Sequence, residues 1–206
     1  MSRPETVLLL IRHAMTDAVG AQLAGRTHDV PLNQSGRAQA ERLRERLATI
    51  ELAAIYTSPM QRAIETAGPI ARDRGLPAEP RRELTEIDFG EWSGLDFVAL
   101  GADPRWRRFN ALRSLAAVPN GERAVETQAR IVGWLDELRS RHVNRTAVCV
   151  THMDVIRLAV LFLIGAPIDF VHRLEIGPAS ITAVAWREHG PVLLCVNESD
   201  ATTRHR

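Results

Sequence analysis

This sequence has little net charge, few cysteines and few long apolar runs. Its 206 residues carry 26 Lys and Arg against 25 Asp and Glu, a balance that argues against nucleic acid or an anionic membrane as partner. Cys149 and Cys195 are the only cysteines and lie in apolar runs, so we expect buried free thiols and a cytoplasmic location. The apolar run 155–164 is too short to span a bilayer, and no secretory leader is expected.

Three further absences narrow the domain organisation and the chemistry. No internal repeat, low-complexity block or linker interrupts the chain, so we expect one domain over 1–206. No glycine-rich loop ends in Lys-Ser or Lys-Thr, which excludes the common nucleoside-triphosphatase motif. A zinc site is not expected, because metal-ligand spacing is absent among His28, His142, His172, His189 and His205.

Short apolar runs alternate with helical patterns along most of the sequence. Runs without a polar face predict buried strands at 6–11, 53–57 and 145–151. Helices are expected after the N-caps Asn33 and Ser58, from 120 to about 142, and from 152 to 164. An extended connection is expected at 77–82, and two alternating runs at 181–186 and 192–196 predict a hairpin or neighbouring strands. The predicted fold class is α/β, a three-layer α/β/α sandwich with a mostly parallel central sheet.

Chemically useful side chains follow the predicted strands where they end. Arg12 and His13 follow the first strand, Arg62 follows the second, and His152 follows the third. Because ligands bind at the carboxyl edge of such sheets, we expect these side chains to meet there. The acidic loop 84–92 supplies Glu86, although three other acids compete in the same stretch: Glu83, Asp88 and Glu91.

Two arginines, two histidines and one carboxyl group suffice for phosphoryl transfer without a metal. Fixed cations stabilise the charge on the equatorial oxygens of the transferred group. His13 is the candidate nucleophile, because neighbouring arginines would lower the pKa of its ring and keep one nitrogen unprotonated. Glu86 is the candidate acid that protonates the leaving oxygen. Ser58 is expected to cap its helix rather than to contact substrate.

The stretch Leu10-Ile11-Arg12-His13-Ala14-Met15-Thr16 resembles the Arg-His-Gly-x-Thr motif of the histidine phosphatase superfamily, which has the phosphoglycerate mutase-like fold. Further motifs follow in the family's order over nearly the whole chain: Gly25-Arg26, Pro31-Leu32, Thr57 to Ala63, Glu86 to Trp92, Pro119 to Glu122, and Val150-Thr151-His152. Each is a weak pattern alone, but their order is specific.

The resemblance implies a role for each matching position and no metal or organic cofactor. It places the phosphorylated histidine at His13, phosphate binding at Arg12, Arg62 and His152, and the acid/base at Glu86. The expected substrate contacts are Arg12, Thr16, Gly25, Arg26, Arg62, His152 and Met153. Substrate choice is expected from loop 17–32 and from 95–121, the candidate lid.

Several positions depart from the family pattern. Ala14 replaces the usual glycine, and Val19 stands where many members, especially mutases, place an asparagine. Met153 and Asp154 replace the usual pair of glycines after the second histidine. Asp154 could favour the helix start, repel a second phosphate or contact a cationic substrate group.

The sequence therefore predicts a metal-independent phosphatase that hydrolyses a phosphomonoester through a phosphohistidine on His13. A phosphoglycerate mutase and a catalytically silent protein that binds a phosphoryl ligand or a partner remain the alternatives. The expected partner is a small phosphorylated metabolite, with no nucleic acid and no membrane, and a homodimer is one alternative for the oligomeric state.

Overall fold

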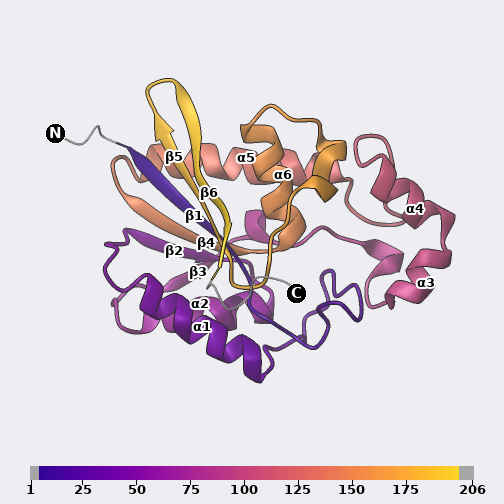
Figure 1. Cartoon of the computed structure of the whole chain (residues 1–206), viewed down its shortest axis with the longest axis horizontal. Helices are drawn as coiled ribbons and strands as arrows, with labels where there is room; N and C mark the ends of the chain where they lie inside the picture. Colours follow the sequence, from indigo (N-terminus) through magenta and orange to yellow (C-terminus); the bar gives the residue numbers. More distant parts are fainter. Residues whose placement is uncertain (1–4, 200–206) are drawn as a thin grey trace.

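In the part of the chain that the structure describes, six strands form one central sheet (Figure 1). The computed structural model describes residues 5–199. The strands lie in the order β3-β2-β4-β1-β5-β6; the first four run parallel, whereas β5 and β6 are antiparallel to their neighbours. The predicted mostly parallel sheet is confirmed. The strands are β1 (Thr6–Arg12), β2 (Ala54–Thr57), β3 (Ala78–Pro80), β4 (Thr146–Thr151), β5 (Ile181–Arg187) and β6 (Gly190–Glu198).

Helices cover both faces of this sheet and complete the predicted three layers (Figure 1). One face packs on α1 (Gln34–Arg46) and α2 (Gln61–Arg72), and the other on α5 (Ala124–Arg141) and α6 (Met153–Leu163). β1 is buried from both sides, because Leu8 and Leu10 face the α5 and α6 layer while Leu9 and Ile11 face the other.

The segment 95–121 lies beside these layers and shares a small apolar core with the loop 87–92. It contains α3 (Phe97–Ala102) and α4 (Pro104–Ala111), which lie at one end of the molecule in Figure 1. Phe109 of α4 packs edge-on against Phe89, with ring centroids 6.1 Å apart. Short 3-10 helices lie at Arg82–Leu84, Gly90–Trp92 and Ile168–Arg173. Within residues 5–199, no helix is long and apolar enough to cross a membrane.

Local expectations were confirmed at one helix start and wrong at another. Asn33 caps α1 as predicted, since its Oδ1 accepts the Gly36 amide at 2.9 Å. Ser58 is not the cap of α2; Met60 occupies that position without a side-chain bond. The physical reason is that Ser58 lies two residues before the cap, where its hydroxyl accepts the Met60 amide at 3.3 Å and bonds a histidine ring.

Two other expectations need adjustment. The extended connection at 77–82 contains a true strand, β3, which pairs in parallel with β2. Both cysteines are free thiols, as predicted, but only Cys149 is fully buried. Cys195 is partly exposed because β6 is an edge strand of the sheet.

Candidate active site

The carboxyl ends of β1, β2 and β4 bring the predicted side chains together. The His13 amide donates to the Thr151 carbonyl at 2.8 Å, which aligns the two strand ends. As a result, the rings of His13 and His152 lie with centroids 5.3 Å apart. The parallel pairing of β1 with β4 therefore explains why residues 139 positions apart share one site.

His13 is held in the form that a nucleophile requires. Its Nδ1 lies 2.8 Å from the Ala14 carbonyl, which can only accept, so Nδ1 carries the proton and Nε2 keeps its lone pair. Burial, followed by the charges of Arg12 and Arg62, lowers the pKa of His13 well below its ordinary value. The ring is therefore neutral at physiological pH.

Arg62 reaches this edge from the first turn of α2 and is almost completely buried. Its Nη2 donates to the Gly25 carbonyl at 2.7 Å and to His152 Nδ1 at 3.3 Å. The Thr66 hydroxyl ties this helix to the end of β1, because it accepts the Ala14 amide at 2.9 Å. Arg62 thus contacts His152, and its charge also acts on His13.

Three buried polar atoms around the histidines have no hydrogen-bond partner within residues 5–199: Arg12 Nε, Arg62 Nε and Thr16 Oγ1. Arg12 is anchored through Nη1, which donates to the Ile176 carbonyl at 2.7 Å. Burial lowers the pKa of Arg12 to about 10, so it stays charged at neutral pH. Unpartnered buried donors are costly in native proteins, and an oxyanion among them would satisfy them.

Hydrogen bonds at both ring nitrogens fix the orientation of His152. Its Nδ1 accepts from Arg62, so Nε2 carries the proton and donates to Ser58 Oγ at 2.8 Å. Burial and the charge of Arg62 lower the pKa of His152 well below its ordinary value. Ser58, predicted only as a cap, therefore orients a histidine of the site.

Glu86 is the acid of the 84–92 loop that faces the histidines. Its Oε2 lies 3.9 Å from His152 Nδ1, and its Oε1 accepts the Ile87 amide at 2.9 Å. Burial, together with the charge of Asp154, raises the pKa of Glu86 to about 7. Two of its competitors are engaged elsewhere: Asp88 accepts the Gly90 amide, and Glu91 accepts from Asn120.

A pocket of about 70 Å³ opens beside His13. Five predicted site residues line it: His13, Thr16, Gly25, Arg62 and Glu86. Gly25 has φ +51°, and a Cβ there would come within 2.7 Å of Ser93 Oγ, so only glycine fits well. The rest of the wall is mainly apolar and includes Val19, the residue that departs from the family pattern: Ala18, Val19, Gln22, Leu23 and Ala24.

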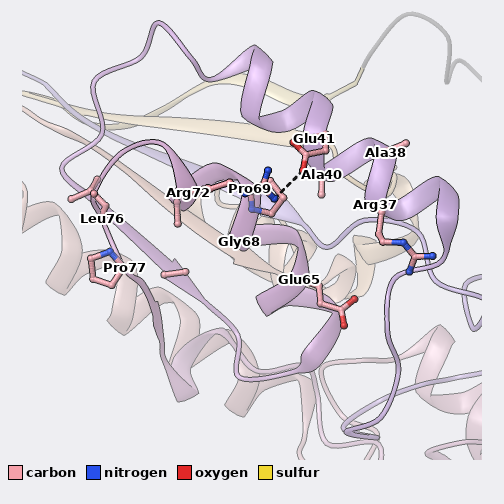
Figure 2. A pocket seen from close by; sticks show the side chains of 13 residues that line it. Arg37, Ala38, Ala40, Glu41, Glu65, Gly68, Pro69, Arg72, Leu76 and Pro77 are labelled. Carbon is pink, nitrogen blue, oxygen red and sulfur yellow. Dashed lines mark ion pairs between the residues drawn. The ribbon is translucent and has the colours of Figure 1, made fainter.

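A larger hollow of about 1110 Å³ lies between α1 and α2 (Figure 2). Small residues such as Gly68 and Pro69 form much of its wall, and an ion pair of 3.0 Å joins Glu41 to Arg72. No histidine or cysteine of the described part of the chain lines this hollow. Among residues 5–199, no three His, Cys, Asp or Glu side chains gather as metal ligands would. The chemistry therefore concentrates at the smaller pocket.

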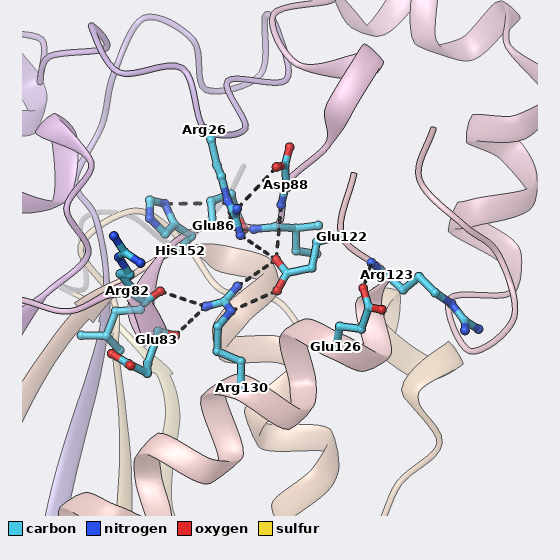
Figure 3. Close-up of polar contacts among 12 residues, drawn as sticks. Arg26, Arg82, Glu83, Glu86, Asp88, Glu122, Arg123, Glu126, Arg130 and His152 are labelled. Atoms are coloured by element: carbon cyan, nitrogen blue, oxygen red, sulfur yellow. Dashed lines mark hydrogen bonds and ion pairs between the residues drawn. The ribbon is translucent and has the colours of Figure 1, made fainter. Parts of the chain in front are cut away.

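Four predicted contacts are not among the residues that line the small pocket: Arg12, Arg26, His152 and Met153. Arg12 is anchored to the Ile176 carbonyl, and His152 is held by Arg62 and Ser58. Arg26 is engaged with the acidic loop and with Glu122 (Figure 3), and Met153 packs against the core on the α5 and α6 side.

Asp154 lies in the first turn of α6, one of the alternatives left open by the sequence, but its carboxylate also meets two arginines. It is buried and pairs with Arg113 at 2.9 Å and with Arg157 at 3.2 Å. Burial alone would raise the pKa of Asp154, but the two arginines outweigh it and lower that pKa. The i,i+3 spacing to Arg157 could be read from the sequence, whereas no local signal pointed to Arg113 after α4.

Comparisons with known proteins agree with this geometry. The family model described as histidine phosphatase superfamily (branch 1) matches residues 8–199. Phosphoserine phosphatase 1 from Hydrogenobacter thermophilus is 30% identical over 201 residues, covering 92% of this chain and 91% of that protein. The Bacillus stearothermophilus YhfR structure has a TM-score of 0.89 at 30% identity and covers 95% of this chain and 98% of its own. The structure of a mycobacterial glucosyl-3-phosphoglycerate phosphatase has a TM-score of 0.85 at 26% identity and covers 95% of this chain and 100% of its own.

Proposed function

The chain belongs to the histidine phosphatase superfamily, and from this premise we propose that it hydrolyses a phosphomonoester without a metal, through a phosphohistidine on His13. The observation that carries the proposal is the free Nε2 of a neutral His13 beside buried, unpartnered arginine nitrogens. A nucleophile and a cradle for phosphate oxygens are what phosphoryl transfer requires.

In the first step, His13 Nε2 attacks phosphorus in line with the ester oxygen. The N–P bond forms as the P–O bond breaks, and the electron pair of that bond leaves on the ester oxygen. Protonated Glu86 gives its proton to this oxygen, so the product leaves as an alcohol. Arg12, Arg62 and Thr16 hold the other phosphoryl oxygens through the donors that lack partners.

In the second step, water attacks the phosphohistidine from the side that the alcohol has left. Glu86, now a carboxylate, takes a proton from the water as the O–P bond forms and the N–P bond breaks. Inorganic phosphate then leaves, His13 recovers its lone pair, and Glu86 is again protonated. The cycle consumes one ester and one water.

The proposed substrate is a small phosphorylated metabolite, in keeping with the phosphatase names of relatives. Val19 in the pocket wall supports hydrolysis over a mutase reaction, because its apolar side chain cannot donate a hydrogen bond to a retained phosphoryl group. A homodimer, a cytoplasmic location and a single domain over 1–206 with 95–121 as lid stay predictions.

A panel of phosphorylated metabolites with 4-nitrophenyl phosphate, assayed with a chelator present, tests this function. We expect phosphate release that the chelator does not affect and that His13→Ala abolishes, because the substitution removes the attacking nitrogen. Transfer of the phosphoryl group to product with a bisphosphate primer would instead support the mutase, and binding without turnover would support a silent protein. Activity that survives His13→Ala would refute the mechanism.

A further inference from the structure

Two arginines from distant segments bond the backbone of the loop that carries Glu86 (Figure 3). Arg26 Nε donates to the carbonyl of Glu86 itself at 2.8 Å. Arg130, on α5, donates through Nη1 to the Glu83 carbonyl at 2.6 Å. Backbone carbonyls on both sides of Leu84 and Thr85 are thus tied to charged side chains, which make stronger bonds than neutral donors.

Glu122 joins the two arginines into one network. One carboxylate oxygen accepts from Arg26 Nη2 at 2.7 Å and from Arg130 Nη2 at 3.0 Å, and the other accepts from Arg130 Nε at 3.0 Å. Figure 3 shows this carboxylate between the two guanidinium groups. Burial would raise the pKa of Glu122, but Arg130 and then Arg26 outweigh it and lower that pKa. Glu122 is therefore ionised when the enzyme works.

The network acts on the geometry of the acid rather than on the phosphoryl group. Neither Glu122 nor Arg130 lines the pocket. The Glu86 carboxyl is fixed on its other side by the Ile87 amide, so its position depends on where the backbone of this loop is held. A small displacement of a proton donor weakens protonation of the leaving oxygen far more than it weakens binding.

We propose that Glu122 is a positioning residue which, through Arg26 and Arg130, holds the Glu86 carboxyl in reach of the leaving oxygen. The inference rests on the proposed function. It also gives Arg26, expected from the sequence to contact substrate, the task of holding the acidic loop.

Glu122→Gln tests the inference when phenyl phosphate is compared with 4-nitrophenyl phosphate. Phenolate is a basic leaving group that needs the proton of Glu86, whereas nitrophenolate leaves with little help. We expect kcat/KM to fall about 10-fold or more for phenyl phosphate and less than about 3-fold for 4-nitrophenyl phosphate. The ratio kcat/KM reports the phosphorylation step, so later hydrolysis of the phosphoenzyme does not mask the effect.

Two other variants keep the test independent of folding. Glu126 is an exposed residue of α5, the helix of Arg130, and its carboxylate accepts the Arg123 amide. Glu126→Gln is expected to leave kcat/KM unchanged for both esters. Arg26→Lys keeps a positive charge beside Glu122, but a lysine cannot reproduce the guanidinium fork that bonds the Glu86 carbonyl and Glu122 together. It is therefore expected to repeat the selective loss even if Glu122→Gln folds poorly.

The outcomes separate the two proposals. Equal losses for both esters in Glu122→Gln and Arg26→Lys, or no loss in either variant, would overturn the positioning role while leaving the function intact. If the wild-type enzyme shows no His13-dependent hydrolysis of either ester, the proposed function fails and the inference fails with it.

Discussion

His13 and Glu86 line the same pocket, and desolvation moves their pKa values in opposite directions. It lowers the pKa of the imidazole and raises that of the carboxyl group to about 7, because a low-dielectric site favours the uncharged form of each. One environment therefore supplies a free base nitrogen and a retained proton at the same pH. Both states are those that phosphorylation of His13 requires.

The pH profile follows from these two shifts. Glu86 must be protonated to act as the acid, so we expect kcat/KM for phenyl phosphate to fall as the pH rises through about 7. His13 stays neutral until the pH is well below its ordinary pKa, so it imposes no loss near neutrality. The control is the pH profile of Glu86→Gln. In this variant the Glu86 proton is gone, whereas the ionisation of the substrate still contributes to the profile. If kcat/KM of that variant still falls near pH 7, the ionisation responsible belongs to a group other than Glu86.

At the scale of elements, the sequence predicted strand ends better than helix starts. Unbroken apolar runs marked β1, β2 and β4, so the positions of His13 and His152 at one sheet edge were predictable. The start of α2 was misjudged because the Ser58 hydroxyl bonds His152, a partner 94 residues away that no local pattern reveals. Contacts of this kind are set by the packed fold rather than by propensity.

The ion pair between α6 and the segment after α4 gives a stability prediction. Asp154→Asn leaves the buried Arg113 and Arg157 without a counter-charge, so we expect unfolding free energy to fall by about 3–5 kcal/mol. The matched variant Asp136→Asn breaks an exposed pair with Arg139 and should cost less than about 1 kcal/mol. Chemical denaturation measures both.

Equal losses in these two variants would contradict a special role for the buried pair. The same Asp154→Asn variant offers a second readout, because the charge of Asp154 helps to raise the pKa of Glu86. Its removal is expected to move the falling limb of the pH profile to lower pH.

For the whole molecule, the order of motifs identified the family, and the alternation of strands and helices predicted the layers. The strand order β3-β2-β4-β1-β5-β6 was not predictable, because it depends on long-range pairing of strands. The same limit hid the roles of Arg113 and Glu122, whose partners come from other parts of the chain. The residues of the chemistry stand out locally, whereas those that hold them in place do not.

The most direct test of the account is detection of the phosphoenzyme. Rapid quenching under alkaline conditions during turnover of 4-nitrophenyl phosphate, followed by peptide mass spectrometry, locates any phosphoryl group on the chain. The account predicts an acid-labile phosphoryl group on His13 and none in His13→Ala. A phosphoryl group on a different residue, or turnover by the His13→Ala protein, would contradict it.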